Sequence, residues 1–142
     1  MTGSGRAEIS VRLAHAGDAP AIAGFDEWNS ATPDRLAAGH CFVATLGGEI
    51  CGLGVFDRSF FRRPFVAIIY VHPDRRRQGI GSALLAHFEH LSGPELMWIS
   101  TNAENVPMQR LLHRRGYDAQ GVVHGLGRVP EVMYRLRPSA GP

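Results

Sequence analysis

Three apolar runs rich in β-branched and aromatic residues follow one another in the middle of the chain. They span Cys41–Leu46, Glu49–Asp57 and Pro64–His72. A Gly-Gly pair separates the first two runs, which is typical of a two-residue hairpin turn, and the loop RSFFRR separates the next two. This pattern predicts an antiparallel meander of three strands.

The period of the apolar positions changes after the third run. Beyond it the apolar residues fall on one face of a helix, at Ile80, Leu84, Leu85, Phe88 and Leu91. Capping residues predict three further helices, at residues 17–29, 32–39 and 105–116. We expect Asp18 to cap the first of these helices and Asn105 to cap the last.

Four more segments have the composition of strands: Glu8–Ala14, Glu95–Thr101, residues 117–123 and residues 130–137. The predicted order is therefore β-α-α-β-β-β-α-β-α-β-β. It belongs to the α/β (α+β) class, with a single mixed, mostly antiparallel twisted sheet of about seven strands and helices on both faces.

Composition narrows the function classes. The 142 residues suit a single domain spanning 1–142, of which we expect residues 1–7 to be flexible. All 15 basic residues are arginines, and the net charge of +2 is too small to predict nucleic-acid binding. No apolar run is long enough for a membrane span, and the first residues lack a signal-peptide core, so a cytoplasmic location is expected. Cys41 and Cys51 are expected to be buried and unbonded, and no metal site is predicted.

The segment VHPDRRRQGIGSALLAHFEH, residues 71–90, joins a strand to a helix through three arginines and two glycines. A helix N-terminus carries unpaired N–H groups and a partial positive charge, which suits a phosphate. Gly79 and Gly81 let an anion approach the backbone and permit positive φ angles. Ser82 adds a hydroxyl in the first turn. These features predict a loop shaped for a pyrophosphate.

Two other phosphate loops do not fit. A Walker loop requires a lysine, and the chain has none. The dinucleotide fingerprint would require Gly or Ala at the position of Leu84.

The strand, the RRRQGIG loop and the following helix resemble the acetyl-CoA site of the GNAT superfamily of N-acetyltransferases. A second signature of that family is an Asn after the fifth strand, then a helix, then Gly-aromatic. It is matched by Asn105 and Gly116-Tyr117. The resemblance extends from ISVRLAHAGDAPAI to PEVMYRL and implies the GNAT acyl-CoA fold.

The resemblance also implies roles for particular residues. Backbone groups of Tyr70 and Val71 would bind the pantetheine arm and the acetyl carbonyl of acetyl-CoA, and the side chain of Asn105 would contact the pantetheine. The backbone amides that would hold the pyrophosphate are those of Arg76, Arg77, Gln78, Gly79, Ile80, Gly81 and Ser82. The implied reaction is direct transfer of an acetyl group from acetyl-CoA to a primary amine of a small molecule or peptide.

The side chains that usually move protons in this family are missing. Phe65 stands where many members have a Glu on the fourth strand, and Leu112 stands where many have a Tyr. Glu27, beside Asp26 at the end of the first helix, and Tyr70 are the remaining candidates for catalysis. The alternative is a catalytically impaired module that binds or senses acyl-CoA. The acceptor amine stays open, as does a homodimer formed through the terminal strands.

Overall fold

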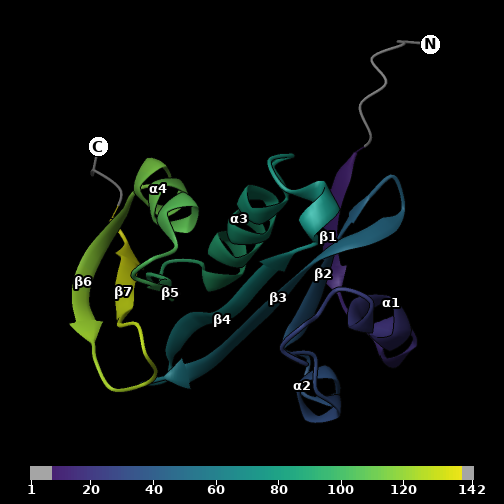
Figure 1. The fold of residues 1–142 in the computed structure, drawn as a ribbon, viewed down its shortest axis with the longest axis horizontal. Helices are drawn as coiled ribbons and strands as arrows, with labels where there is room; N and C mark the ends of the chain where they lie inside the picture. The colour runs from purple at the N-terminus through teal and green to yellow at the C-terminus, as the bar shows by residue number, and fades with distance from the viewer. Residues whose placement is uncertain (1–7, 139–142) are drawn as a thin grey trace. The chain divides into compact units, whose positions relative to one another are not determined.

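The computed structural model describes residues 8–138; the segment expected to be flexible, residues 1–7, lies outside the described residues. The strands are β1 (Ile9–Leu13), β2 (Cys41–Leu46), β3 (Glu49–Phe60), β4 (Arg63–Val71), β5 (Trp98–Asn102), β6 (Tyr117–Val123) and β7 (Glu131–Leu136). The α-helices are α1 (Ala19–Ala23), α2 (Pro33–Ala37), α3 (Ile80–Ser92) and α4 (Val106–Arg114). Short 3₁₀ helices, η1 (Ala16–Asp18) and η2 (Pro73–Arg75), precede α1 and follow β4 (Figure 1).

The strands form a seven-stranded mixed sheet in the order β1-β2-β3-β4-β5-β7-β6. β4 and β5 are parallel and pair at Phe65–Trp98 and Val66–Ile99. The pairs β1–β2, β2–β3, β5–β7 and β6–β7 are antiparallel. The prediction of a mixed, mostly antiparallel sheet of about seven strands is therefore confirmed.

The chain divides into two compact units. Unit 1 comprises the described residues of Met1–Phe56 together with Ile68–His87, and unit 2 comprises Asp57–Ala67 together with the described residues of Phe88–Pro142. In unit 1, buried residues of β2 and β3 include Val43 and Leu53, which pair with each other. Gly52 of β3 is buried where the first turns of α3 pass closest, because a Cβ on it would lie 2.8 Å from Cγ2 of Ile80.

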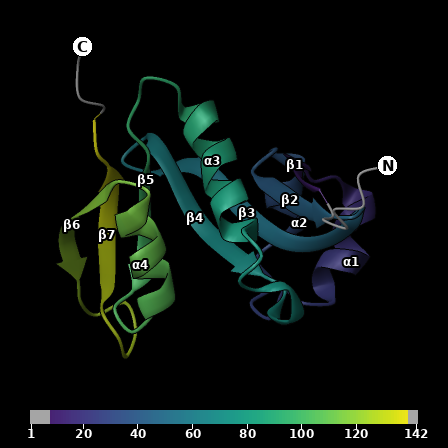
Figure 2. The same ribbon diagram turned by 90° about the horizontal axis from the view of Figure 1, so that it is seen from above.

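Unit 2 has its own core between α4 and the last strands. Leu112 of α4, Tyr117 of β6 and Ile99 of β5 are 0%, 1% and 2% exposed. Both views show α4 beside β6 and β7 (Figures 1 and 2). Asn105 caps α4 as predicted, since its Oδ1 accepts a hydrogen bond from the amide of Met108 over 3.2 Å. Among the described helices, none combines the length and the apolar composition that a membrane span requires.

The predicted helix at residues 17–29 is wrong in length. The structure has η1 followed by the five residues of α1. The carboxylate of Asp18 makes no side-chain cap bond for α1; it accepts bonds from Arg12 at 2.8 and 3.0 Å and from the amide of His15 at 2.9 Å. The ion pair with Arg12 of β1 therefore occupies the carboxylate that was expected to cap the helix.

The segment between β3 and β4 also differs from the prediction. RSFFRR is not a loop, because β3 continues to Phe60 and β4 begins at Arg63. Phe61 and Arg62 form the turn, with φ of 49° and 61°. A two-residue turn with both φ angles positive is normally marked by Gly, Asn or Asp, and neither residue here is one of these, so the sequence did not predict so tight a turn.

Candidate functional site

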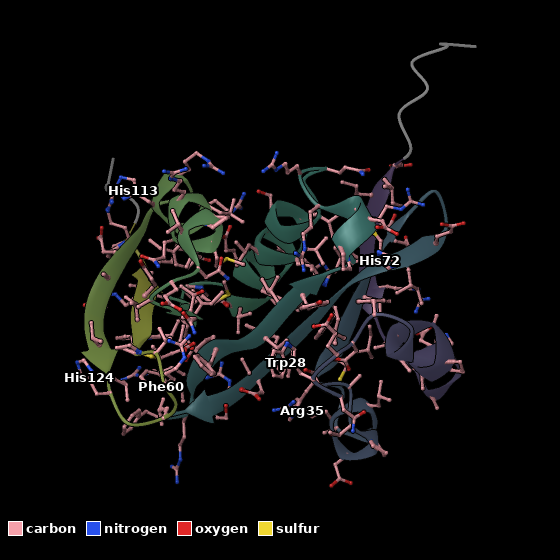
Figure 3. The ribbon with its side chains drawn as sticks, in the orientation of Figure 1. Trp28, Arg35, Phe60, His72, His113 and His124 are labelled. Carbon is pink, nitrogen blue, oxygen red and sulfur yellow. The ribbon has the colours of Figure 1, made fainter. Side chains whose placement is uncertain are left out.

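The end of β4 leads into a fixed turn before α3. The ring nitrogen Nδ1 of His72 accepts a hydrogen bond from the amide of Asp74 over 3.0 Å, so that His72 caps η2. Its own amide donates to the carbonyl of Cys51 over 2.7 Å, which ties the turn to β3. Figure 3 labels His72 at this junction. His72 therefore positions the loop that follows.

Two residues of the loop have positive φ. Gly79 has φ of +84° immediately before α3, as predicted, and Arg77 has φ of 65°. Gly81 lies inside the first turn of α3, so the expectation that both glycines supply a left-handed turn holds for Gly79 alone. An arginine in this region is uncommon, and the composition of the loop gave no sign of it.

The helix begins with amides that have no intrahelical acceptor. The N–H groups of Ile80, Gly81 and Ser82 lie in the first turn, and the first backbone bond of the helix runs from the amide of Ala83 to the carbonyl of Gly79 over 3.0 Å. Ile80 is 1% exposed, so the helix start is anchored in the core of unit 1 while residues 76–79 are exposed. Free donors, positive helix charge and a glycine with left-handed φ fit the diphosphate of coenzyme A.

The three arginines of the loop have different surroundings. Arg75 pairs with Glu49 over 3.1 Å, so its charge is partly engaged. Arg76 donates from Nε to the carbonyl of Val71 over 3.4 Å and places its guanidinium 5.5 Å from the centre of the Tyr70 ring. Arg77 is exposed. Arg76 and Arg77 are therefore the exposed cations that this loop presents.

Tyr70 belongs to a row of three rings in unit 1. Its ring stacks on Phe25 with a centroid distance of 6.2 Å and an interplanar angle of 11°. Phe25 also contacts the ring of His72 at 5.6 Å. The row orients the Tyr70 side chain at the end of β4. Phe25 was missed at the sequence level, because only the fold brings the end of α1 to the end of β4.

Glu27 and Asp26 face different surroundings. Glu27 is exposed and lines a pocket of about 250 Å³ with Phe25, His72 and neighbouring residues. Asp26 accepts a bond at Oδ2 from the amide of Ala31 over 3.0 Å, and its buried Oδ1 has no hydrogen-bond partner among the described residues. Asp26 therefore stabilises the segment between α1 and α2, and Glu27 is the carboxylate available to a ligand.

The structure assigns the predicted site residues to the two units. Tyr70, Val71, Glu27 and residues 76–82 all belong to unit 1, whereas Asn105 is exposed in unit 2. The side-chain nitrogen Nδ2 of Asn105 is left for a ligand, because Oδ1 is the atom that caps α4. Leu112 is fully buried and fills the core of unit 2.

Cys41 and Cys51 lie in the core, and neither forms a disulfide. Cys41 pairs with Val55 and Ala44 with Gly52, one residue away from the register that a plain Gly-Gly hairpin gives, because the ladder is irregular after Ala44. Burial raises the pKa of both thiols, which keeps them protonated and unreactive. The described residues contain no group of three or more His, Cys, Asp or Glu that could hold a metal ion.

Comparisons with known proteins agree with this geometry. The model of the acetyltransferase (GNAT) family matches residues 12–117. Among solved structures, a GNAT-family acetyltransferase from Bacillus cereus aligns with a TM-score of 0.83 and 25% identity, over 94% of this chain and 99% of that chain.

Two further structures share the fold. The ribosomal-protein-S18-alanine N-acetyltransferase from Escherichia coli aligns with a TM-score of 0.72 at 21% identity, over 94% of this chain and 97% of that chain. Naa50 from Arabidopsis thaliana, in complex with the bisubstrate analogue CoA-Ac-MVNAL, also has a TM-score of 0.72, at 13% identity, over 91% of this chain and 98% of that chain. A search of curated proteins gave no match.

Proposed function

The chain belongs to the acetyltransferase (GNAT) family, and we propose that it moves an acetyl group from acetyl-CoA directly to a primary amine of a small molecule or peptide. Members of this family are acetyltransferases, and the proposal starts from acyl transfer from acetyl-CoA. The primary amine, the direct route and the residues below are the proposal. We further propose that residues 1–142 act as a single acetyltransferase domain.

The observation that carries the proposal is the start of α3. Gly79, with φ of +84°, turns the chain so that the amides of Ile80, Gly81 and Ser82 begin the helix together. The amides of Arg76, Arg77, Gln78 and Gly79 precede them on the same exposed loop. Several donors on one short segment suit an anion with several oxygens, such as the diphosphate of coenzyme A.

The end of β4 supplies the rest of the proposed cosubstrate site. The pairs with β5 end at Val66–Ile99, whereas β4 continues to Val71. Backbone groups of Tyr70 and Val71 are proposed to bind the pantetheine arm and to hold the acetyl carbonyl. Asn105 is proposed to donate its side-chain amide to the pantetheine. Acetyl-CoA, when bound, supplies an acetyl group already activated as a thioester.

Proton transfer is assigned to the two remaining candidates. An amine attacks only as the free base, and a lysine-like amine with a pKa near 10.4 is mostly protonated at pH 7. Glu27, exposed beside the pocket, is proposed to take that proton through water. Tyr70 is proposed to donate a hydrogen bond to the sulfur as the carbon–sulfur bond breaks. A thiol with a pKa near 8.5 is a good leaving group, so this assistance need only be modest.

The test has two separate readouts. Coenzyme A should raise the unfolding temperature of the purified protein in a saturable manner, and acetyl-CoA with a panel of primary amines should release free thiol. If coenzyme A fails to stabilise the protein, the proposal falls. If it stabilises the protein but no amine in the panel releases thiol, the catalytically impaired acyl-CoA-binding module is favoured. The replacement of the usual Tyr by the buried Leu112 is the observation behind that alternative.

A further inference from the structure

Aromatic side chains of unit 2 gather where the tip of the β3–β4 hairpin meets β5. The ring of Phe60 contacts three others, with centroid distances of 5.0 Å to Phe61, 5.3 Å to Phe65 and 5.2 Å to Trp98. The guanidinium of Arg135 on β7 lies 6.0 Å from the centre of the Trp98 ring. Figure 3 labels Phe60 at the end of β3. These five side chains form the aromatic cluster, and the proposed acetyl transfer uses none of them.

The aromatic cluster lies on the face of the sheet opposite α4. Phe65, Trp98 and Arg135 are cross-strand neighbours on β4, β5 and β7, so their side chains share one face. Ile99 follows Trp98 on β5 and therefore points to the other face, where it is buried. Tyr134, which pairs with Ile99, donates a hydrogen bond to α4 there over 3.5 Å. Because α4 covers that other face, the side chains of the cluster stay partly exposed.

Phe61 gives the cluster a ring that is open to solvent. It is 82% exposed, and it forms the turn of the hairpin with Arg62 although a positive φ is unfavourable for both residues. The turn is nevertheless held in place. Arg58 donates from Nη1 to the carbonyl of Arg62 over 2.9 Å and also pairs with Glu95, while the ring of Phe60 meets that of Phe61 at 89°. The hairpin therefore presents a large apolar ring at a fixed position.

Positive charge accompanies the rings. Arg62 and Arg63 are exposed beside the turn, and Arg135 is partly exposed on β7. No described residue forms an ion pair with any of these three arginines. The carboxylates of Glu95 and Asp118 lie beside this face, but each already pairs with another arginine. The cluster therefore combines aromatic rings with cations that are available to an anion.

We propose that the aromatic cluster binds single-stranded nucleic acid, independently of the transfer reaction. Each nucleotide carries a planar base that stacks on an aromatic ring and a phosphate that pairs with an arginine. A base would stack on Phe61, with phosphates at Arg62 and Arg63 beside the turn and at Arg135 across β5. An acidic peptide would meet the same cations, but it has no regular planar group for the rings. The net charge of +2 did not predict this surface, because carboxylates elsewhere in the chain offset the arginines gathered here.

Fluorescence anisotropy tests the binding directly. The protein is titrated into labelled strands of about eight nucleotides, one of thymidylate and one of uridylate. We expect saturable binding of at least one, and the tighter of the two identifies the kind of strand. The logarithm of the affinity should fall with the logarithm of the salt concentration with a slope of about −2, because three arginines each contribute about −0.7. A duplex of the same length, whose bases are stacked on each other, should bind at least tenfold more weakly. Equal binding of the duplex, or no saturable binding, would overturn the proposal.

Variants separate the rings from the charges. Phe61→Ala should lower the affinity about tenfold and leave the salt slope unchanged, whereas Phe61→Trp keeps a stacking ring and should bind like the wild type. Arg63→Gln should weaken binding to every sequence and reduce the slope by about 0.7. Leu126→Ala and Arg128→Gln remove an exposed apolar side chain and an exposed arginine elsewhere in unit 2 and should change neither quantity. Wild-type affinity in Phe61→Ala, or equal losses in Arg63→Gln and Arg128→Gln, would contradict the site.

Competition tests the other possible occupant. A polyglutamate of matched charge should not displace the labelled strand at concentrations where the unlabelled strand does. If it displaces the strand equally well, the surface takes acidic chains in general and the nucleic-acid proposal falls. These measurements need no acetyl-CoA and no amine, so failure of this inference and failure of the proposed function are seen separately.

Discussion

The phenol of Tyr117 donates a hydrogen bond to Oε2 of Glu89 over 2.8 Å and so joins β6 to the last turns of α3 within unit 2. The guanidinium of Arg115 donates to the same carboxylate, from Nε over 3.2 Å and from Nη2 over 2.7 Å. Burial of the ring, followed by the bond to Glu89, raises the pKa of Tyr117, so that the phenol stays protonated and keeps donating. One carboxylate thus satisfies two donors at the edge of the core.

Removing that carboxylate should cost more than removing either donor. Glu89→Ala leaves the buried phenol of Tyr117 and the guanidinium of Arg115 without their acceptor, and we expect the free energy of unfolding to fall by about 3 kcal/mol. Tyr117→Phe leaves Arg115 on Glu89 and should cost about 1 kcal/mol. Urea unfolding followed by circular dichroism measures both losses.

A matched control is the exposed pair of Arg58 and Glu95, also in unit 2. Glu95→Ala should leave the unfolding midpoint unchanged, because exposed ion pairs contribute little. Equal midpoints for Glu89→Ala and the wild type would show that the Tyr117 network does not stabilise the fold.

The ion pair between Arg12 and Asp18 should make stability depend on pH at the acidic end. The hydrogen bonds from Arg12 lower the pKa of Asp18 to about 2. A carboxyl group with a lowered pKa stabilises the folded state above its unfolded pKa near 3.9, and this contribution is lost as the pH falls from about 4 to about 2. The shift corresponds to roughly 2.5 kcal/mol, which the exposure of Arg12 reduces to about 1 kcal/mol.

Asp18→Asn measures this contribution. The variant should be less stable than the wild type at pH 7, and the difference should shrink between pH 4 and pH 2.5 in urea unfolding series. A difference that is constant over that range would mean that the charge of Asp18 does not matter and that its other hydrogen bonds carry the effect.

Gly79→Ala should weaken the binding of coenzyme A. A Cβ at φ of +84° costs roughly 1–2 kcal/mol, and the loop can relieve this strain by moving the amides that start α3. We expect a dissociation constant at least tenfold higher by isothermal titration calorimetry. Gly93→Ala is the control, since Gly93 has φ of +59° at the other end of the same helix and open space around it. If both variants bind coenzyme A like the wild type, the loop does not hold it.

Gly52→Ala should also act on the start of α3, by a different route. The added Cβ would lie 2.8 Å from Cγ2 of Ile80 and 3.3 Å from Cβ of Ala44. Overpacking of this kind typically costs 1–3 kcal/mol, and here it pushes on the first residue of the helix. We expect a lower unfolding temperature together with weaker binding of coenzyme A. Ile80→Leu, which removes the Cγ2 methyl, should recover part of both losses in the double variant, and purely additive losses would contradict the contact.

The elements that the sequence predicted well are those whose information is local. Cys41–Leu46 and residues 117–123 are strands with the predicted bounds, and Asn105 caps α4, because periodicity and capping chemistry are written in neighbouring residues. The loop at residues 76–79 and the start of α3 at Ile80 were predicted for the same reason. Gly79 directly precedes the helix in the chain, so the turn and the helix start can be recognised from neighbouring residues.

The failures depend on contacts between distant segments. Asp18 was expected to cap a long helix, but Arg12 of β1 holds its carboxylate. The close approach of Ile80 to Gly52 could not be predicted, because the two residues lie far apart in the chain. The ring row of Phe25, Tyr70 and His72, and with it the pocket that Glu27 lines, exists only once α1 and the end of β4 meet. The residues around the pocket were therefore less predictable than the loop before α3.

Tyr70→Phe tests the assignment of the thiolate donor. The variant keeps the ring that stacks on Phe25 and lies under the Arg76 guanidinium, and it removes only the hydroxyl. If that hydroxyl stabilises the leaving sulfur, kcat should fall about tenfold or more while KM for acetyl-CoA stays within twofold, because the proposed backbone contacts with the cosubstrate are unchanged. Tyr117→Phe, which removes a hydroxyl bonded to Glu89 in unit 2, should leave kcat unchanged at temperatures where it is folded. A Tyr70→Phe variant with wild-type kcat would show that the thiol departs without help from this side chain, and Glu27 would then be the one side chain of the proposed mechanism that moves a proton.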